Sequence, residues 1–580
     1  MATLCQGTTA RSIHKPALLP QSSAARTWTS VLLPSLATAA LLWLCYFPAD
    51  CGWLAWIALV PLLSLVRSPA RARRIYFASW LGGLVLFGVS LQWIRVADYR
   101  MYATWACLAV YCSFYVPLGI YLLRCLDRRT RLPLVISLPL VWTALEFFRA
   151  HFLLGGFPWY FLSHTQHAFL PIIQVADLAG AYAVTVLVAA VNACLFEFLY
   201  PQSWFRRLFA LPAEAICLSR SALLYQTIAI LVLVGAALGY GGWRLSQNEW
   251  QDGPRIALLQ GNLDQRLRNE ATSPDALEDK LQTMRDHFRR LCDKAAREQT
   301  DLIVWPETSF VYNWLEVSPD LPADQIPEEW RGVNKRRQDL ARSVAERWQT
   351  NLLLGVNAGG LGPDARARRY NSAVLVEQDG KVGGRYDKMH CVPFGEYVPF
   401  RDWLPWMNTF APYDFDYSIT PGDQLTRFTL GKYHFGVVIC FEDTDPYIAR
   451  QYAGGDEKPV VDFLVNISND GWFDGTSEHE EHLAICRFRA VECRRAIARA
   501  VNMGISAVID GNGQVIKLPG SDWASSKKTA AVLTAAIPID RRVSLYARWG
   551  DWLPWACWVV IGVGLVWGRL RPAVKQFKTV

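Results

Sequence analysis

The sequence predicts an α/β domain inserted between the helices of a membrane bundle, and three observations support this fold class. Residues 28–243 and 553–568 are apolar and nearly free of acidic residues, whereas residues 244–552 carry most of the acidic residues. The apolar regions break into runs near the roughly 20 residues that cross a ~30 Å hydrocarbon core. Residues 244–552 instead alternate between short β-branched runs and segments of helical periodicity, as layered α/β domains do.

Eight apolar runs are expected to span a membrane. Seven of them precede residue 244 and one follows the α/β domain; the second run is short and the sixth is long. Buried helices of a soluble protein are the alternative, but so many apolar runs in succession are typical of a membrane protein. The expected spans are residues 28–46, 52–67, 76–94, 103–124, 132–149, 172–199, 223–243 and 553–568.

Basic residues are concentrated in alternate loops between the expected spans. The loops after the second, fourth and sixth spans and the C-terminal tail are rich in Arg and Lys, whereas the other loops carry few. Because basic loops stay on the cytoplasmic side, we expect both termini, including the polar segment 1–27, in the cytoplasm and residues 244–552 outside it. Much of the Lys and Arg behind the net charge of +8 lies in short loops, so this charge is no sign of nucleic-acid binding.

A few polar residues lie in or near the expected spans, where an unpaired charge would be costly. A transport pathway is one interpretation of them. We favour the other, in which they pair inside the bundle, with Glu146 and Arg149 as a pair at a span end. The residues concerned are Gln92, Glu146, Arg149, Asp177 and Glu197.

Residues 244–552 read as alternating strands and helices. Asp379-Gly380 and the run Asp510 to Gly513 are typical of tight hairpin turns. Pro446 is expected to open a helix, since proline suits the first helical position. Strands are expected over 255–262, 301–306, 351–356, 372–376, 381–386, 435–439 and 461–467, and helices over 274–298, 334–349 and 477–500.

Two loops and one short stretch are rich in aromatic residues. The loops 310–330 and 401–417 combine Trp, Tyr and Phe with proline, which indicates either a binding surface, a lid that dips into a membrane, or simple packing on the domain. The stretch 155–159, Gly-Gly-Phe-Pro-Trp, is expected to anchor the chain at a membrane interface.

Cofactor and metal motifs are not evident. The chain has 14 cysteines but no CxxC pair, no GxGxxG and no P-loop. The segment 478–482, Glu-His-Glu-Glu-His, is not the HExxH pattern, so we expect no metal there. Five cysteines fall in residues 244–552, and this odd number leaves at least one free thiol. They are Cys292, Cys391, Cys440, Cys486 and Cys493.

Three residues at expected strand ends form a candidate catalytic group. Cys440 ends the buried run Phe435 to Ile439, Glu307 follows the strand DLIVWP, and Lys388 lies just past another strand. Loops at the ends of buried strands are where α/β domains keep their active groups. A thiol at a strand-to-helix junction is expected to favour the thiolate form, although a lone cysteine is more often a buried structural residue. Nucleophile, base and cation together are typical of acyl transfer through a thioester.

Four motifs carry a resemblance to the nitrilase (carbon–nitrogen hydrolase) superfamily. They are WPET at 305–308, YDKMHCVPFGEYVPF at 386–400, ICFED at 439–443 and SNDGWF at 468–473. With QGN at 260–262 and the spans on both sides, the chain resembles the apolipoprotein N-acyltransferase family over nearly its whole length. The resemblance implies an αββα sandwich. It also implies that Glu307 is the general base, Lys388 stabilises the oxyanion and Cys440 is the nucleophile, with Glu396 and Glu442 supporting the site.

Two positions depart from the pattern of the family. Phe441 stands where many members have Tyr, which removes a hydroxyl, and Arg268-Asn269 stands where a Trp is expected. Neither departure touches the triad, so they affect substrate contacts. Trp403, Trp406 and Trp472 are the candidate substrate-binding residues.

The resemblance implies a reaction in two halves at the bacterial inner membrane. A phospholipid, phosphatidylethanolamine by analogy, acylates Cys440, and the α-amine of a diacylglyceryl-modified lipoprotein then takes the acyl chain. It implies a monomer with a periplasmic catalytic domain and no cofactor. Two alternatives remain open: a membrane-tethered amidase or nitrilase that transfers the acyl group to water, and a transporter or receptor with an inactive nitrilase-like domain.

Overall fold

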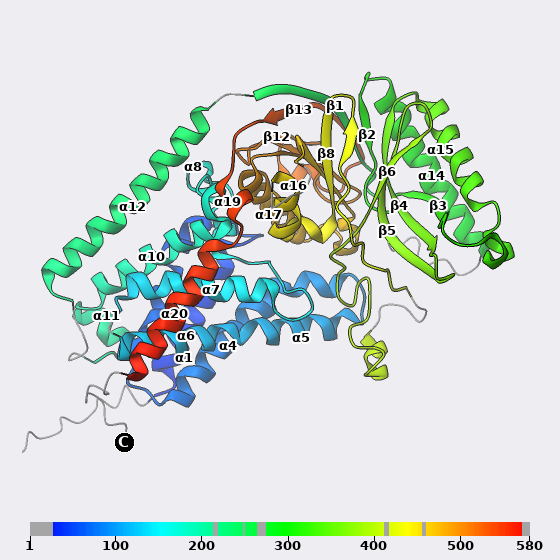
Figure 1. Ribbon diagram of the computed structural model, residues 1–580. Coiled ribbons are helices and arrows are strands. Elements are labelled where there is room, and N and C mark those ends of the chain that lie inside the picture. The colour runs from blue at the N-terminus through cyan, green and yellow to red at the C-terminus, as the bar shows by residue number, and fades with distance from the viewer. Residues whose placement is uncertain are drawn as a thin grey trace, which may run out of the picture.

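The computed structural model describes residues 27–130, 132–212, 218–247, 250–263, 274–410, 417–454 and 460–570. Figure 1 shows a two-sheet domain that lies over one end of a helical bundle, with α12 (Arg220–Ser246) standing at the side of the bundle and leading up toward β1 (Trp250–Gln260). The expected N-terminal segment, Arg268-Asn269 and the end of the basic tail lie outside the described residues.

One sheet combines parallel and antiparallel neighbours. Its order is β13-β1-β2-β4-β5-β6, with β3 also paired to β4. β1, β2 and β4 run parallel, whereas β13, β5 and β6 pair antiparallel with their neighbours. The strands besides β1 are β2 (Leu302–Val304), β3 (Phe310–Val317), β4 (Asn351–Leu361), β5 (Ala367–Val376), β6 (Val382–Asp387) and β13 (Ala531–Asp540).

The second sheet has the order β12-β11-β10-β9-β8-β7. Its central strands β8, β9 and β10 are parallel, and the hairpin expected at 510–513 joins β11 to β12. The strands are β7 (Phe428–Leu430), β8 (Tyr433–Ile439), β9 (Phe463–Ser468), β10 (Ala496–Val501), β11 (Ala507–Ile509) and β12 (Val515–Lys517).

The two sheets pack face to face and helices cover both outer faces, which confirms the expected αββα sandwich. Side chains alternate along each strand: Ile256 and Val437 lie in the core between the sheets, whereas Ala257 and Val438 pack under the outer helices. The covering helices are α14 (Pro274–Ala296) and α15 (Val333–Trp348) on the first sheet, and α16 (Pro446–Ala453) and α17 (Glu478–Cys493) on the second; α18 (Trp523–Ser526) and α19 (Leu545–Trp549) are short.

Two sequence-based assignments in this domain are wrong. The helix expected over 477–500 ends at Cys493, and residues 496–501 form β10, a buried strand between β9 and β11. Arg494 has a φ of +50°, a left-handed conformation that ends the helix. The loop expected over 310–330 contains β3, which pairs with β4 through Trp314 and its neighbours. In both places pairing within a sheet overrides the local pattern.

Helices occupy all eight expected spans. Among the described residues, six helical segments are long and apolar enough to cross a membrane, while those in the first two spans are shorter. The bundle consists of α1 (Thr29–Cys45), α2 (Ala55–Ala58), α3 (Val60–Arg67), α4 (Ala72–Ser90), α5 (Met101–Ser113), α6 (Tyr115–Arg129), α7 (Leu134–His151), α8 (Leu170–Ile173), α9 (Ala176–Ala179), α10 (Ala181–Leu199), α11 (Ser203–Leu208), α12 and α20 (Trp552–Leu570).

The sixth expected span is not one continuous helix. Two single turns, α8 and α9, precede Gly180, and α10 begins only after it. Gly180 has a φ of +72°, and a Cβ there would lie 2.8 Å from the ring of Tyr546. Glycine therefore both permits the left-handed turn and leaves room for a residue of the catalytic domain.

The charged residues singled out in the spans have partners, but not all of the expected ones. Arg67 binds Glu197 at 2.6 Å and Asp127 at 3.2 Å. Glu146 accepts a hydrogen bond from the Leu162 N–H, and Arg149 donates to the Trp159 and Tyr160 carbonyls. The expected pair of Glu146 with Arg149 is therefore replaced by separate hydrogen bonds to the chain that follows α7.

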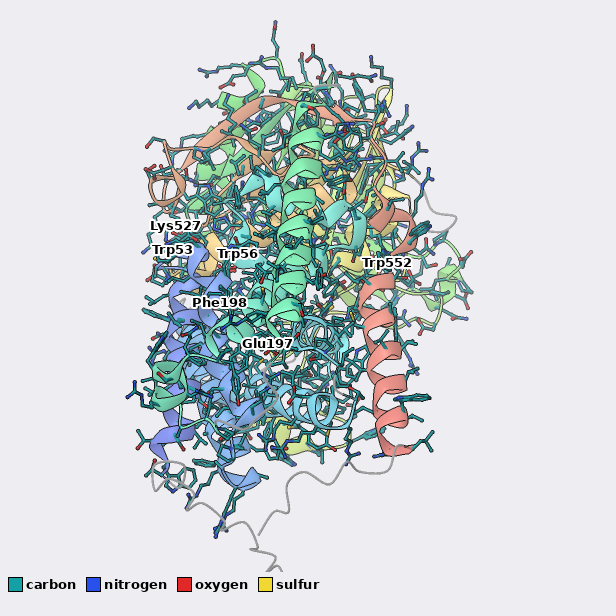
Figure 2. The ribbon with its side chains drawn as sticks, turned by 90° about the vertical axis from the view of Figure 1, so that its left-hand side faces the viewer. Trp53, Trp56, Glu197, Phe198, Lys527 and Trp552 are labelled. Atoms are coloured by element: carbon teal, nitrogen blue, oxygen red, sulfur yellow. The ribbon has the colours of Figure 1, made fainter. Side chains whose placement is uncertain are left out.

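Tryptophans mark the level at which the bundle meets the catalytic domain. Figure 2 shows Trp53, Trp56 and Trp552 at nearly the same height, with Glu197 deeper in the bundle. Trp53 and Trp552 are exposed. Indole rings at the ends of apolar helices are typical of a membrane–water interface.

Candidate active site

Three strand ends bring Glu307, Lys388 and Cys440 together at one edge of the sandwich. Glu307 lies beyond β2, Lys388 directly follows β6 in the first sheet, and Cys440 directly follows β8 in the second. Lys388 Nζ lies 3.5 Å from Glu307 Oε1, and the charges of both residues act on the pKa of the Cys440 thiol. The structure brings the three expected residues together, and their catalytic roles stay a prediction.

Lys388 is a buried cation held between two carboxylates. Its Nζ lies 2.8 Å from Glu396 Oε1 and 3.5 Å from Glu307 Oε1. Burial disfavours the ammonium, but Glu396 and Glu307 more than compensate and raise the pKa of Lys388 well above its ordinary value. Burial also raises the pKa of Glu307, against the opposing charge of Lys388. A carboxylate whose pKa is raised is a better proton acceptor for a thiol.

Asn371 joins the two carboxylates and was not found from the sequence. Its Nδ2 donates to Glu307 Oε1 at 2.6 Å and to Glu396 Oε1 at 3.2 Å. It lies within β5, one residue before the strand expected over 372–376, and a single Asn in a strand carries no local signal of this role. Asn371 fixes the oxygen of Glu307 that faces Lys388.

Cys440 occupies a strained turn rather than the start of an α-helix. It has a φ of +52° and begins a 3₁₀ turn, Cys440–Thr444, that separates β8 from α16. A non-glycine residue in this conformation costs about 1–2 kcal/mol. Helix α16 does begin at Pro446, as expected.

The environment of the thiol does not favour the thiolate, contrary to the sequence-based expectation. Burial raises the pKa of the Cys440 thiol, the charge of Glu307 raises it further, and Lys388 and His482 lower it. The thiol is therefore neutral at rest, and attack on a carbonyl requires a base to remove its proton.

This direction predicts the pH dependence of thiol alkylation. Because the pKa of Cys440 is raised, the rate at which iodoacetamide alkylates it should keep rising up to at least pH 9, by about tenfold per pH unit while the thiol is mostly protonated. Mass spectrometry of the peptide that contains Cys440 measures this rate separately from the other cysteines. A rate that levels off below pH 7 would contradict a neutral resting thiol.

Glu442 ties the nucleophile turn to the loop that carries Lys388. Its buried carboxylate accepts hydrogen bonds from the N–H groups of Ile439, Met389 and His390 and from the Tyr386 hydroxyl, at 2.6–3.0 Å. Burial raises the pKa of Glu442 to about 7, although these N–H groups favour the carboxylate. One side chain thus sets the spacing between the two sheets at the site.

A tryptophan of the bundle reaches the nucleophile turn. Trp159 stacks on Phe441 with ring centroids 6.3 Å apart and planes 6° apart, and its indole N–H donates to Glu481 at 2.8 Å. Trp159 is buried, so the expectation that residues 155–159 anchor the chain at a membrane interface is wrong for this residue. Phe441, where a hydroxyl was expected, makes an apolar contact with the bundle instead.

The candidate substrate-binding tryptophans lie in two different places. Trp403 and Trp406 are 85% and 59% exposed on an arm that ends in the 3₁₀ helix Pro405–Phe410. In Figure 1 this arm hangs from the catalytic domain toward the end of α5, which it contacts. Trp472 is half-buried in the turn Asp470–Phe473, next to Phe473, which packs on Trp93 of the bundle. Residues 411–416 of the second aromatic loop lie outside the described residues.

The segment 478–482 contributes to a buried ion network beside Cys440. His482 Nε2 lies 2.7 Å from Asp443, and its Nδ1 lies 3.3 Å from both Asp470 and Glu478. Arg499 binds Asp443 and Asp470 at 2.7 and 3.0 Å. Carboxylates lie at both ring nitrogens, so His482 fits as an imidazolium. Burial alone would lower the pKa of His482, but these carboxylates outweigh burial and raise it well above its ordinary value. A second cation, Arg499, already neutralises the carboxylates.

The cysteines form no disulfide among the residues that the structure describes. Cys292, Cys391, Cys486 and Cys493 are free and buried, and Cys440 is free and half-buried. The free thiol that the odd number of cysteines required is therefore present, and the other four are free as well.

Comparisons with known proteins agree with this site and with the bundle. The family model of the apolipoprotein N-acyltransferase N-terminal domain matches residues 38–194, and that of carbon-nitrogen hydrolases matches residues 255–546. The apolipoprotein N-acyltransferase of Geobacter metallireducens is 33% identical over 525 residues, covering 88% of this chain and 90% of that protein. The one of Rhodopirellula baltica is 29% identical over 589 residues, covering 94% and 98%.

Among solved structures, Nit3 of Saccharomyces cerevisiae, a member of the nitrilase superfamily, covers 51% of this chain and 92% of its own at 18% identity and a TM-score of 0.34. The fold assignment therefore rests on the strand pairing described above and on the family models.

Proposed function

The chain belongs to the family of apolipoprotein N-acyltransferases, and from that premise we propose that it moves a fatty acyl chain from a membrane phospholipid to the N-terminal cysteine of lipoproteins, with Cys440 as the acyl carrier. It is an acyltransferase of the carbon–nitrogen hydrolase superfamily. The observation that carries the proposed site is the convergence of a buried carboxylate, a buried cation and a strained thiol.

In the first half of the reaction, Glu307 takes the proton of the Cys440 thiol as Sγ attacks the ester carbonyl of the phospholipid. Lys388 Nζ stabilises the oxyanion that forms, since it is held as a fixed cation by Glu307 and Glu396. The ester C–O bond then breaks, and the proton on Glu307 passes to the departing oxygen. The products are a lysophospholipid and a thioester on Cys440.

In the second half, the α-amine of the diacylglyceryl-modified N-terminal cysteine attacks the thioester. Glu307 takes the amine proton, the C–S bond breaks and the proton returns to Sγ. The result is an amide on the lipoprotein and the free thiol of Cys440. Covering aromatic residues such as Phe441 and Trp159 would keep water from the thioester between the two halves.

The location of the reaction is part of the proposal. The positions of the basic loops support an orientation with both termini in the cytoplasm and the catalytic domain outside it. The proposed location is the bacterial inner membrane, with the catalytic domain in the periplasm, and the proposed state is a monomer. Phosphatidylethanolamine is the proposed donor. The arm that carries Trp403 and Trp406 contacts α5 of the bundle, and these two residues are proposed to contact the lipid substrates, with Trp472 as a third candidate.

Hydrolysis of a small amide is the weaker alternative. The match of an acyltransferase N-terminal model to residues 38–194 and the contact of Trp159 with the nucleophile turn both link the bundle to the site, and a soluble amide would need neither. Transfer to an amine rather than to water separates the two functions experimentally.

Acylation of the purified protein tests the proposal. Bilayers that contain phosphatidylethanolamine labelled in its acyl chains should leave a hydroxylamine-sensitive label on Cys440. Cys440→Ala should remove the label completely, because Cys440 is the thiol whose pKa responds to the charges of both Glu307 and Lys388. Cys391→Ala is the matched control, since Cys391 is also buried and free near the site, and it should keep the label.

Discharge of the label identifies the acceptor. Addition of a diacylated lipopeptide should move the acyl chain to its α-amine, whereas the same peptide with a blocked amine should leave the thioester intact. A label that persists in Cys440→Ala would overturn the acyl-enzyme, and release of the label only as free fatty acid would favour the hydrolase.

A further inference from the structure

Helix α17 is one of the elements through which the catalytic domain packs against the bundle. Ile485, Phe488 and Val491 lie on one side of it and pack into the bundle core. Leu483, Cys486 and Ala490 lie on the other side and pack under the second sheet. With 16 residues the helix is about 24 Å long. The catalytic domain and the bundle therefore pack on opposite sides of the same buried helix.

The first turns of α17 contact the active site, and its last turn contacts the junction with the bundle. His482 binds Asp443 of the nucleophile turn, and Glu481 binds Trp159, which stacks on Phe441. At the other end, Glu492 accepts a hydrogen bond from the Ala181 N–H at the start of α10. A shift of α17 at the junction is thus transmitted to the turn that holds Cys440.

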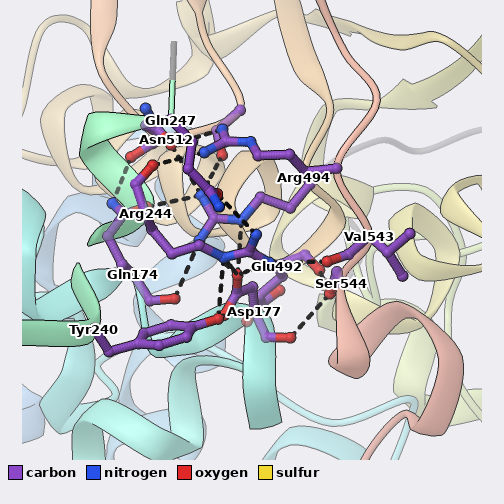
Figure 3. A network of polar contacts seen from close by, with 12 residues as sticks. Gln174, Asp177, Tyr240, Arg244, Gln247, Glu492, Arg494, Asn512, Val543 and Ser544 are labelled. Carbon is purple, nitrogen blue, oxygen red and sulfur yellow. Dashed lines mark hydrogen bonds and ion pairs between the residues drawn. The ribbon is translucent and has the colours of Figure 1, made fainter. Parts of the chain in front are cut away.

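Asp177 binds side chains from both sides of this junction. It lies in α9 and is fully buried. Figure 3 shows three groups converging on its carboxylate: Arg494, just after α17, at 2.7 Å, Arg244 from the end of α12 at 2.6 Å, and the Tyr240 hydroxyl at 2.7 Å. One carboxylate of the bundle therefore joins the catalytic domain and the helix that leads to it.

The guanidinium of Arg494 is completely satisfied at this place. It donates to Asp177 through Nε and Nη2, and to the Gln174 side chain, the Gly511 carbonyl and the Asn512 side chain through Nη1, at 2.7–3.0 Å. Such a set of partners fixes the position and the orientation of the end of α17. A lysine could not satisfy it.

Helix α12 is held in place by the same carboxylate, that of Asp177. Among its residues only Ala237, Gly241 and Arg244 are buried, so little apolar packing holds it to the bundle. Arg244 also donates to the Val543 carbonyl, and Arg542 donates to the Arg244 carbonyl, both in the segment that follows β13. Without Asp177, the guanidinium groups of Arg244 in α12 and Arg494 after α17 would lose the carboxylate that they share.

We propose that Asp177, through Arg494 and α17, is a positioning residue that sets the catalytic domain on the bundle so that Cys440 faces lipid held in the bilayer. The proposal rests on the acyltransfer function above. It assigns Asp177 no part in the chemistry, because it contacts neither the thiol nor its base among the described residues. Its loss should impair access of bilayer lipid to Cys440 and leave the intrinsic reactivity of the thiol unchanged.

The test compares two reactions of the same thiol in the full-length protein. Asp177→Asn, reconstituted in bilayers that contain acyl-labelled phosphatidylethanolamine, should form the thioester at least about tenfold more slowly than wild type. Alkylation of Cys440 by iodoacetamide at pH 8.5, a water-soluble probe that needs no bilayer geometry, should stay within about twofold of wild type. In mixed detergent micelles, where lipid approaches from any direction, the acylation defect should shrink to less than about threefold.

Matched variants separate positioning from loss of folding. Asp127→Asn removes another buried bundle carboxylate paired with an arginine, Arg67, far from the junction, and should not split the two reactions. If Asp177→Asn is not recovered as a monodisperse protein, Arg494→Lys keeps the charge but loses several of the guanidinium hydrogen bonds. It should also slow acylation in bilayers without slowing alkylation, but by a smaller factor.

Two results would overturn the inference: equal losses of acylation and alkylation in every recovered variant, or an unchanged acylation rate in bilayers. Absence of acylation in the wild-type protein would instead refute the proposed function itself.

Discussion

Replacing Glu307 with Gln is expected to slow the acylation of Cys440 by roughly 10²- to 10⁴-fold, the usual contribution of a general base. Gln keeps the size of Glu and can still accept the hydrogen bond from Asn371, so the site should keep its shape. It cannot take a proton. Because the pKa of the Cys440 thiol is raised, few molecules would hold a thiolate at neutral pH without that base.

The same substitution should have the opposite effect on direct ionisation of the thiol. The negative charge of Glu307 is one of the causes that raise the pKa of Cys440, so Glu307→Gln should lower it. Alkylation by iodoacetamide at pH 9.5 is therefore expected to be as fast as in wild type or faster, while acylation by phospholipid at pH 7.5 falls. Both rates are followed by mass spectrometry of the Cys440 peptide.

A neighbouring carboxylate outside the site provides the control. Glu316 is partly exposed on β3 and pairs with Arg337 and Arg385. Glu316→Gln should leave both rates within about twofold of wild type, since surface ion pairs contribute little. If acylation by the Glu307→Gln protein ran at the wild-type rate, Glu307 would not be the base, and a parallel fall of both rates would indicate a collapsed site.

Sequence reasoning reached Glu307 and Cys440 because they follow short, strongly apolar strands, whereas Lys388 follows the more polar strand β6 and was recognised with the help of its motif. The runs before Glu307 and Cys440 are buried on both faces, and their ends are recognisable from the abrupt change to polar residues. The residues that hydrogen-bond to the triad have no comparable signal in the sequence. Asn371 lies in the middle of β5 with no local pattern around it, and its two carboxylate partners lie 64 and 25 residues away.

Contacts between the bundle and the catalytic domain were the least predictable part. Trp159 has the sequence context of an interfacial anchor, yet it packs on Phe441 some 280 residues later in the chain. The end of α17 was missed for a similar reason. Residues 496–501 are compatible with a helix locally, and only their place between β9 and β11 makes them a strand. Such choices depend on tertiary pairing, which no window of sequence contains.

The structure shows which contacts Phe441 makes in place of the expected tyrosine hydroxyl. A Tyr there would carry a hydroxyl, whereas Phe441 stacks flat on Trp159 and meets His390 edge-on. The nucleophile turn is therefore in contact with the bundle through an apolar surface, and the polar link between the two parts is shifted to Glu481 and to the junction at Asp177.

Loss of the Glu442 carboxylate is expected to be the most damaging change to the structure of the site. Glu442→Gln places an amide N–H₂ among three backbone N–H groups and the Tyr386 hydroxyl. The carbonyl of Gln can replace Oε1, which accepts from Met389 and His390, but then the Ile439 N–H loses its acceptor Oε2, at about 1–3 kcal/mol. This loss should lower the unfolding midpoint of the catalytic domain by about 2–10 °C.

The effect on acylation should exceed what this loss of stability explains. Glu442 joins the loop of Lys388 to the turn of Cys440, so without it the cation and the thiol are no longer held at one spacing, and a misplacement of about 1 Å can cost about 10²-fold in rate. Acylation measured well below the lowered midpoint separates the two effects. Glu396→Gln is the informative comparison, because Glu396 binds Lys388 but does not reach the turn of Cys440. Slower acylation with an unchanged unfolding midpoint in Glu442→Gln would mean that the turn holds its shape without the carboxylate, and full activity would remove Glu442 from the site.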